Sequence, residues 1–263
     1  MVPFTPIHAA VAVPLLRTPL VPSAVVAGAV APDLPYYVPL TWIGGDYNLT
    51  LTHTWTSVLW LDAAIGLLLL VVFHALLKRP LLALAPDALA RRAAPTADGF
   101  SWRSGRDAAL VLASVVVGAA THLAWDALGD AFGYERSGAV NLVSDGVGAV
   151  VLVTWLALWW RSTATSAPVR PTGLTERERR AVVTAVVVAT VAWAALRTVQ
   201  VAREVSADLR EYGGWSRSAV LDAAARETVT SAVVALALSV AVVAVLWHLR
   251  QVRGGRRRAG SGT

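Results

Sequence analysis

The chain has 263 residues, of which 56% are hydrophobic and 15% are charged, and its mean hydropathy is +0.57. This balance excludes an ordinary water-soluble domain and is typical of a membrane protein with several spans. The net charge of +6 is explained by cationic loops beside a membrane, so we expect no nucleic-acid partner. Because the chain has no cysteine, any metal ion must be held by His and carboxylate side chains.

Long apolar segments predict an all-α fold, a polytopic transmembrane helix bundle with about six membrane segments. The first segment, 7–40, contains Arg17 and several prolines. It is therefore either a short helix followed by a full span or a re-entrant hairpin of two half-length helices. The other five segments cover 56–77, 107–128, 141–160, 181–200 and 228–248. Thr175 and Glu178 have the spacing of a capping box, which predicts a helix start ahead of the 181–200 segment.

The distribution of Lys and Arg predicts the orientation in the membrane. These residues concentrate in three stretches, 78–106, 161–180 and the C-terminal tail, and are sparse in the alternate stretches, 34–55, 129–140 and 201–227. Since cationic loops stay in the cytoplasm, we expect a multi-pass protein of the cell (inner) membrane with a cytoplasmic C-terminus. The segment from Asp33 to His53 then faces outward.

Two regions are expected along the chain. Residues 1–160 form a membrane core that contains the polar candidates for a metal site. Residues 161–263 add a cytoplasmic linker, two further transmembrane helices and a basic tail, which we expect to contact acidic membrane lipids. No pattern in the sequence indicates an oligomeric state.

The sharpest pair of candidate ligands is His122 and Asp126. Residues four positions apart share one face of a helix, and ionisable side chains within a membrane helix are functional candidates. Asp33 and His53 fall at the same membrane level, which completes a set of two histidines and two carboxylates suited to zinc or another divalent ion. The alternative for His122 and Asp126 is a buried hydrogen bond that ties helices together.

Four further residues have roles that the pattern leaves open. His8 joins the set only if the first segment is a hairpin, because a single span would leave it at the opposite face. Asp62 lies within a span and suits a structural or pathway role. Asp130 and Asp145 suit contacts behind the ligands or a second metal.

Five short motifs follow one another along the first part of the chain: Pro3-Phe4-Thr5-x-x-His8, Gly28-x-x-x-Pro32-Asp33, Thr52-His53-Thr54, Phe73-His74-x-Leu76-Leu77-Lys78-Arg79-Pro80-Leu81 and Thr121-His122-Leu123-x-Trp125-Asp126. With these motifs, residues 3–160 resemble a bacterial integral-membrane family known as a domain of unknown function. That family is similar to membrane-bound metal-dependent hydrolases of the LexA-binding inner-membrane type. More distantly, the order of His and Asp resembles the ligand series of zinc-dependent phospholipase C.

The resemblance implies the following metal ligands: His8, Asp33, His53, His122 and Asp126. We therefore expect a metal-dependent hydrolase, with zinc the favoured ion, that acts on a phosphoester or lipid-linked substrate at the outer face. Asp33, Asp126 or Asp130 would serve as general base. The alternative is a non-enzymatic membrane protein in which the same residues form a structural ion site or a polar helix clamp.

Overall fold

The computed structural model describes residues 5–38, 51–96, 104–131, 134–163 and 174–260, with the side chains of 5–6, 96, 129–130, 134–142 and 254–260 left aside. The described residues contain helices and no strand. Five helices are long and apolar enough to cross a membrane: Ser57–Leu84, Gly105–Leu128, Val143–Ser162, Glu176–Glu211 and Arg217–Arg253. The fold is therefore an all-α polytopic helix bundle, as the sequence predicts.

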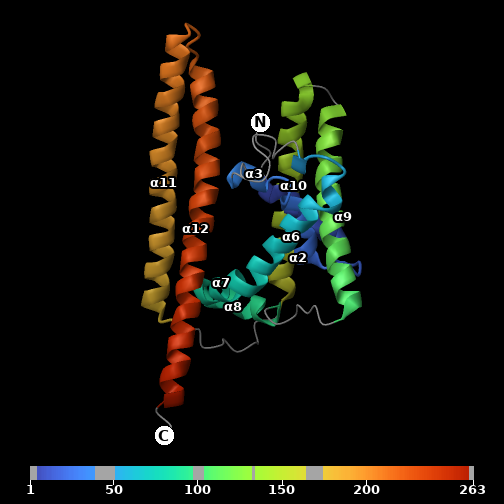
Figure 1. Ribbon diagram of the computed structural model, residues 1–263, viewed down its shortest axis with the longest axis vertical. Coiled ribbons are helices and arrows are strands. Elements are labelled where there is room, and N and C mark those ends of the chain that lie inside the picture. The colour runs from blue at the N-terminus through green and yellow to red at the C-terminus, as the bar shows by residue number, and fades with distance from the viewer. Residues whose placement is uncertain (1–4, 39–50, 97–103, 132–133, 164–173, 261–263) are drawn as a thin grey trace. The chain divides into compact units, whose positions relative to one another are not determined.

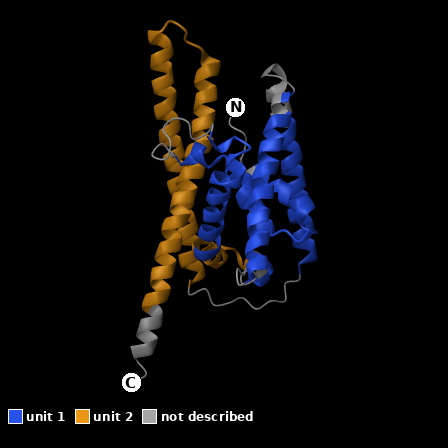
Figure 2. Ribbon diagram, turned by 45° about the vertical axis from the view of Figure 1, so that its right-hand side comes forward, with its two compact units in different colours: residues 1–75, 91–167 blue, residues 76–90, 168–263 orange. Residues whose placement is uncertain are grey.

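The chain divides into two compact units (Figure 2). Unit 1 comprises residues 1–75 and 91–167, and unit 2 comprises residues 76–90 and 168–263. The sequence places a boundary near residue 160, but it gives no sign that the short stretch 76–90 belongs with the C-terminal helices. The reason is that this stretch packs against α11 and α12 through long-range contacts that no local pattern encodes.

The first apolar segment of unit 1 forms two short helical pieces and no full span. η1 (Thr5–Val11) and α1 (Ala12–Leu15) make the first piece, and α2 (Pro22–Val30) makes the second. Pro22 begins α2, where its missing N–H costs no helical hydrogen bond. Because α2 packs against η1, the two pieces form the hairpin of half-length helices that the prolines suggest.

Helix α2 lies at the centre of unit 1, against α6 (Leu61–Val71) and α9 (Gly105–Ala131) (Figure 1). Its backbone approaches α9 closely through two glycines. A Cβ added at Gly28 would lie 2.0 Å from the Val115 carbonyl oxygen, and one added at Gly118 would lie 2.1 Å from the Val25 carbonyl oxygen. Ser114 adds a polar contact, since its Oγ accepts a hydrogen bond of 2.8 Å from the Val21 backbone N–H. Small side chains therefore set the position of α2 against α9.

Short helices and a long one complete unit 1. α3 (Leu34–Tyr37) follows α2, η3 (Ser57–Leu59) precedes α6, and η4 (Val72–Leu77) is a π-helical stretch after α6. α10 (Tyr134–Ser162) packs against η1 and, less extensively, against α9. The segment between α6 and α9 contains α7 (Lys78–Leu84), which belongs to unit 2, α8 (Asp87–Ala93), which crosses the boundary after residue 90, and η5 (Ala94–Thr96).

Unit 2 is dominated by α11 (Glu176–Glu211) and α12 (Arg217–Gly260), which run side by side (Figure 1). The predicted capping box is confirmed: Thr175 Oγ1 accepts from the Glu178 N–H, and Glu178 accepts from the Thr175 N–H. The stretch 201–227, which separates two of the predicted membrane segments, is largely helical, because α11 continues to Glu211 and α12 begins at Arg217. The turn between them contains Gly213 at φ +70°, a left-handed conformation that glycine adopts without strain.

Candidate metal centre

Three separate segments of unit 1 bring four candidate ligands together. Asp33 follows the last turn of α2, and His53 precedes η3. His122 and Asp126 lie one turn apart on α9, so the spacing of four residues aims both at one point. Asp33 and the His122 side chain are fully buried, whereas the side chains of His53 and Asp126 are 25% and 30% exposed. The cluster therefore has a closed side and an accessible side.

Four atoms of this cluster have the spacing of a metal-ligand set. His53 Nε2 lies 3.4 Å from Asp33 Oδ1 and 3.7 Å from Asp126 Oδ2. His122 Nε2 lies 3.5 Å and 3.2 Å from the same two oxygens. Four tetrahedral ligands at the usual zinc distances would lie about 3.3 Å from one another. The two imidazoles and two carboxylates suit a zinc-type ion in donor chemistry, and their four nitrogen–oxygen distances are close to this value. Possible ligand atoms of Asp33, His53 and His122 also lie within 4.8 Å of one another.

The orientation of His122 gives the strongest local argument for a cation. Its Nδ1 lies 2.8 Å from the Ala29 carbonyl oxygen, which only accepts hydrogen bonds, so Nδ1 carries the hydrogen and donates. Nε2 is buried, makes no hydrogen bond and faces carboxylate oxygens of Asp33 and Asp126. This arrangement is stable when a metal ion binds Nε2 or when a proton lies between Nε2 and one of the carboxylates. A backbone carbonyl behind the far nitrogen is also how proteins orient metal-binding histidines.

The loop that carries His53 is held by hydroxyl groups. Thr52 Oγ1 lies 3.2 Å from His53 Nδ1, so it contacts the ring nitrogen that points away from the carboxylates. Ser57 Oγ donates to Asp62 Oδ2 at 2.6 Å and also lies 2.6 Å from the Thr54 carbonyl oxygen. Asp62 is fully buried. These contacts favour the structural role for Asp62, as the support of the His53 loop.

His8 also reaches the cluster. Its ring lies 4.1 Å, centroid to centroid, from that of His122, and possible ligand atoms of His8, His122 and Asp126 lie within 4.8 Å of one another. Burial, and then the neighbouring His122, lower the pKa of His8 from its ordinary 6.5, which favours the neutral ring that can bind a metal. Tyr36 stands edge-on to His53, and burial followed by the charge of Asp33 raises the pKa of its phenol above 10.

The remaining candidate residues either lie away from the His/Asp cluster or have side chains that the structure does not describe. Asp130 belongs to α9, but its side chain lies outside the described part of the structure. Asp145 lies on α10 and is partly buried. His74 pairs with Ser23 Oγ at 3.1 Å, and His248 Nε2 lies 3.1 Å from the Leu76 carbonyl oxygen, so neither histidine joins the cluster.

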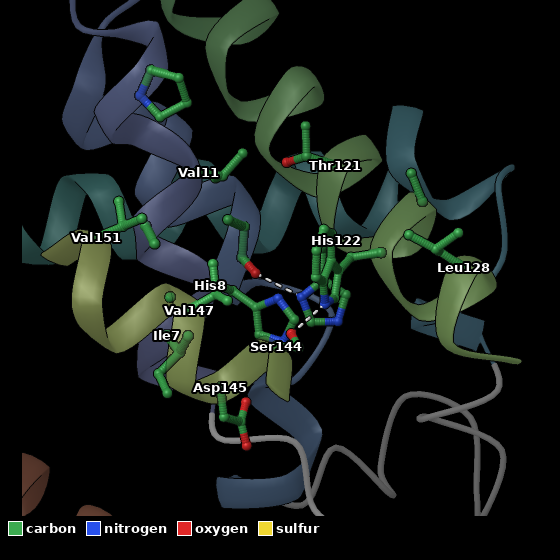
Figure 3. Close-up of a pocket in the computed structure, with 16 residues that line it drawn as sticks. Ile7, His8, Val11, Thr121, His122, Leu128, Ser144, Asp145, Val147 and Val151 are labelled. Carbon is green, nitrogen blue, oxygen red and sulfur yellow. Dashed lines mark hydrogen bonds between the residues drawn. The ribbon is translucent and has the colours of Figure 1, made fainter. Parts of the chain in front are cut away.

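A cavity of about 500 Å³ adjoins the cluster within unit 1 (Figure 3). His8 and His122 form part of its wall, and the rest is mostly apolar side chains from η1, α1, α9 and α10. Trp125 Nε1 donates a 2.5 Å hydrogen bond to Ser144 Oγ, which joins α9 and α10 at this wall. A proposed ion at the cluster would therefore lie beside an apolar space.

Several groups that support the cluster are not predicted from the sequence. The Ala29 carbonyl has no signature in the sequence, because any residue supplies one. Thr52 precedes His53 in the motif Thr52-His53-Thr54, and a hydroxyl next to a candidate ligand is a sequence signal for a group that orients the ligand. The cavity depends on which apolar side chains of separate helices face one another, and that is decided by tertiary packing.

These features define a class: a polytopic α-helical protein with a buried His/Asp cluster formed by the N-terminal hairpin, the His53 loop and α9. Residues 2–135 match the domain of unknown function DUF4184, so the chain belongs to that family. The match includes every residue of the cluster and ends at the start of α10, short of the expected residue 160. Comparisons with curated proteins and with solved structures gave no match.

Proposed function

We propose that this protein is a membrane-bound metal-dependent hydrolase, with zinc as the favoured ion, that cleaves a phosphoester in a lipid or lipid-linked substrate. The observation that carries the proposal is the arrangement of His53, His122, Asp33 and Asp126, in which each histidine Nε2 lies 3.2–3.7 Å from an oxygen of each carboxylate. His8 would complete the ligand set. As part of the same proposal, the protein is bacterial and distantly similar to metal-dependent hydrolases and phospholipase C.

The reaction would be hydrolysis. A water oxygen bonds to phosphorus, the phosphorus–oxygen bond to the alcohol breaks, a base takes a proton from water and the leaving alcohol gains one. A divalent ion supplies an activated water and polarises the phosphoryl oxygen. Of the two described carboxylates, Asp126 is better placed to take the proton, because it is 30% exposed while Asp33 is completely buried. Asp130 stays a candidate one turn further along α9.

The proposed location is the inner membrane, with a cytoplasmic C-terminus and a site that opens to the outer face. The support is the clustering of Lys and Arg in 78–106, 161–180 and the tail. His53, which precedes η3 and α6, and the end of α9 that carries His122 and Asp126 are both remote in sequence from the cationic stretch 78–106. Membrane lipids are therefore the proposed partners, and no nucleic acid is expected.

Metal content is the first test. Protein purified in detergent would be measured by elemental analysis as wild type, as His53→Ala and as the control His74→Ala. His53 is partly exposed, so its replacement should leave the fold intact. We expect near-stoichiometric metal in wild type and in the control, at least tenfold less in His53→Ala, and zinc-dependent release of p-nitrophenol from methyl p-nitrophenyl phosphate in wild type. Metal-free wild type after reconstitution would refute the proposal.

A structural ion site is the second candidate, and one observation favours it. Asp33 and His122 are fully buried, and the His122 Nδ1–H bond to Ala29 already ties α9 to α2. Such a clamp binds metal and stabilises the fold without turnover. Stoichiometric metal together with no hydrolysis of phosphomonoesters, phosphodiesters or phospholipids would establish this role and exclude the hydrolase.

A further inference from the structure

The cavity beside the cluster suggests what kind of molecule reaches it. Its wall combines two very different parts. At one place the rings of His8 and His122 face the space, and elsewhere it is lined by apolar side chains, among them Ile7, Val11 and Val151 (Figure 3). A ligand that fills it must be apolar over most of its surface and polar near the two histidines.

The charge of the cavity wall limits which class of ligand can bind there. Among the described residues that line the cavity there is no Lys or Arg, and Asp145 is the one carboxylate. A nucleotide or a free sugar phosphate would find neither cationic partners nor enough hydrogen bonds there, since buried polar groups need partners. An anionic group would be stable only at the cluster, next to the proposed ion.

The surroundings of the cavity indicate the route of entry. Its walls on α9 and α10 belong to helices that are candidate membrane spans. Three lining residues of these helices are about half exposed: Trp125 at 45%, Leu128 at 48% and Val147 at 55%. On a membrane-spanning helix such apolar exposure faces lipid, so a chain could enter sideways from the bilayer without crossing water.

We infer that the cavity between η1, α9 and α10 binds the apolar chain of a lipid phosphoester whose phosphate lies at the His/Asp cluster. The position of the phosphate rests on the proposed function, whereas binding of the chain can be measured without turnover. The α10 part of the wall lies beyond residues 2–135, the part matched to the family.

Two substitutions on α10 give a matched test. Val147 lines the cavity and is 55% exposed, while Val150, one turn away, is 65% exposed and is not part of the lining. Val147→Trp should fill the space and Val150→Trp should not. Both side chains are largely outside the packed interior, so both variants should fold. Gly148 is less suitable, because a Cβ there would already lie 2.1 Å from Ile7 Cγ2.

The probe is hexadecylphosphonate with a photoreactive diazirine in its alkyl chain, added to the full chain in phosphatidylcholine nanodiscs. Its carbon–phosphorus bond is not cleaved by ester hydrolysis. We expect crosslinks to residues 7–14 and 144–151 that unlabelled hexadecylphosphonate displaces. The yield should fall at least fivefold in Val147→Trp and stay within twofold of wild type in Val150→Trp. Equal yields in the two variants, or crosslinks that are not displaced, would overturn the inference.

A turnover assay separates this inference from the proposed function. It compares p-nitrophenol release from hexadecyl and methyl p-nitrophenyl phosphate. If wild type prefers the hexadecyl ester and Val147→Trp loses this preference, the result supports both the hydrolase and the lipid-binding cavity. Equal hydrolysis of the two esters without specific crosslinking keeps the hydrolase and overturns the lipid cavity. Displaceable crosslinking that is sensitive to Val147→Trp, without hydrolysis of either ester, keeps the cavity and overturns the hydrolase.

Discussion

The two units use membrane-length apolar sequence in opposite ways. Unit 2 consists mainly of α11 and α12, uninterrupted helices of 36 and 44 residues. Unit 1 interrupts its N-terminal apolar segment with prolines and buries ionisable side chains beside the resulting short helices. A continuous helix satisfies its own backbone and can present side chains only along its surface. Broken helices let several chain segments end at one point, and this is where the cluster lies.

The largest expected effect concerns the response of stability to zinc. An ion that binds only the folded state at 100 to 1,000 times its Kd raises the free energy of unfolding by about 2.7–4.1 kcal/mol. We expect zinc to raise the thermal midpoint of wild-type protein in detergent. This increase should be lost in Asp126→Asn, which keeps the side-chain shape but weakens a ligand. It should persist in the unit 2 control His248→Ala. Loss of the increase in both variants would contradict a site confined to unit 1.

A second, smaller effect tests the close packing of α2 against α9. Gly118→Ala places a methyl group against the backbone of Val25 and should cost about 1–3 kcal/mol of stability. Gly146→Ala on α10 meets nothing within 4 Å, and it should be neutral or stabilise by up to about 1 kcal/mol. Thermal unfolding of the pair measures the difference. Since α9 carries His122, Gly118→Ala should also lower the metal content, and unchanged metal would show that the cluster tolerates a shift of α9.

The smallest effect is expected at the polar contact between α11 and α12. Arg197 Nε lies 3.1 Å from Glu227 Oε1, which also accepts a 2.5 Å hydrogen bond from Ser231 Oγ. Both charged side chains are partly exposed, so the ion pair is screened and Glu227→Gln should cost no more than about 1 kcal/mol. Thermal unfolding and elemental analysis of the same sample check this. Metal content should equal that of wild type, and its loss would show that unit 2 supports the cluster.

Local patterns were sufficient wherever the physics is local. Each of the five predicted membrane-length segments corresponds to one observed helix, because length and apolar composition alone satisfy the requirement for a span. The spacing of His122 and Asp126 placed both on one face of α9, and the capping box at Thr175 formed as predicted. The limits of α11 and α12 were underestimated, because polar residues such as Arg210 continue a helix beyond its apolar part.

Tertiary structure decided what lies far apart in the sequence. The sequence pattern of the first segment was compatible with both a span and a hairpin. The hairpin is what places His8 next to His122. The approach of α2 to α9 depends on Gly28 and Gly118 meeting backbone atoms of the other helix.

The amino-acid sequence by itself determined the helical class, the membrane-length segments and the chemical types available for an ion site. The fold alone decided that the Nε2 atoms of His53 and His122 lie 3.2–3.7 Å from oxygens of Asp33 and Asp126 and that an apolar cavity adjoins this cluster. The physical reason is that helix formation and membrane insertion depend on neighbours along the chain, whereas a ligand set and a cavity depend on distances between separate helices.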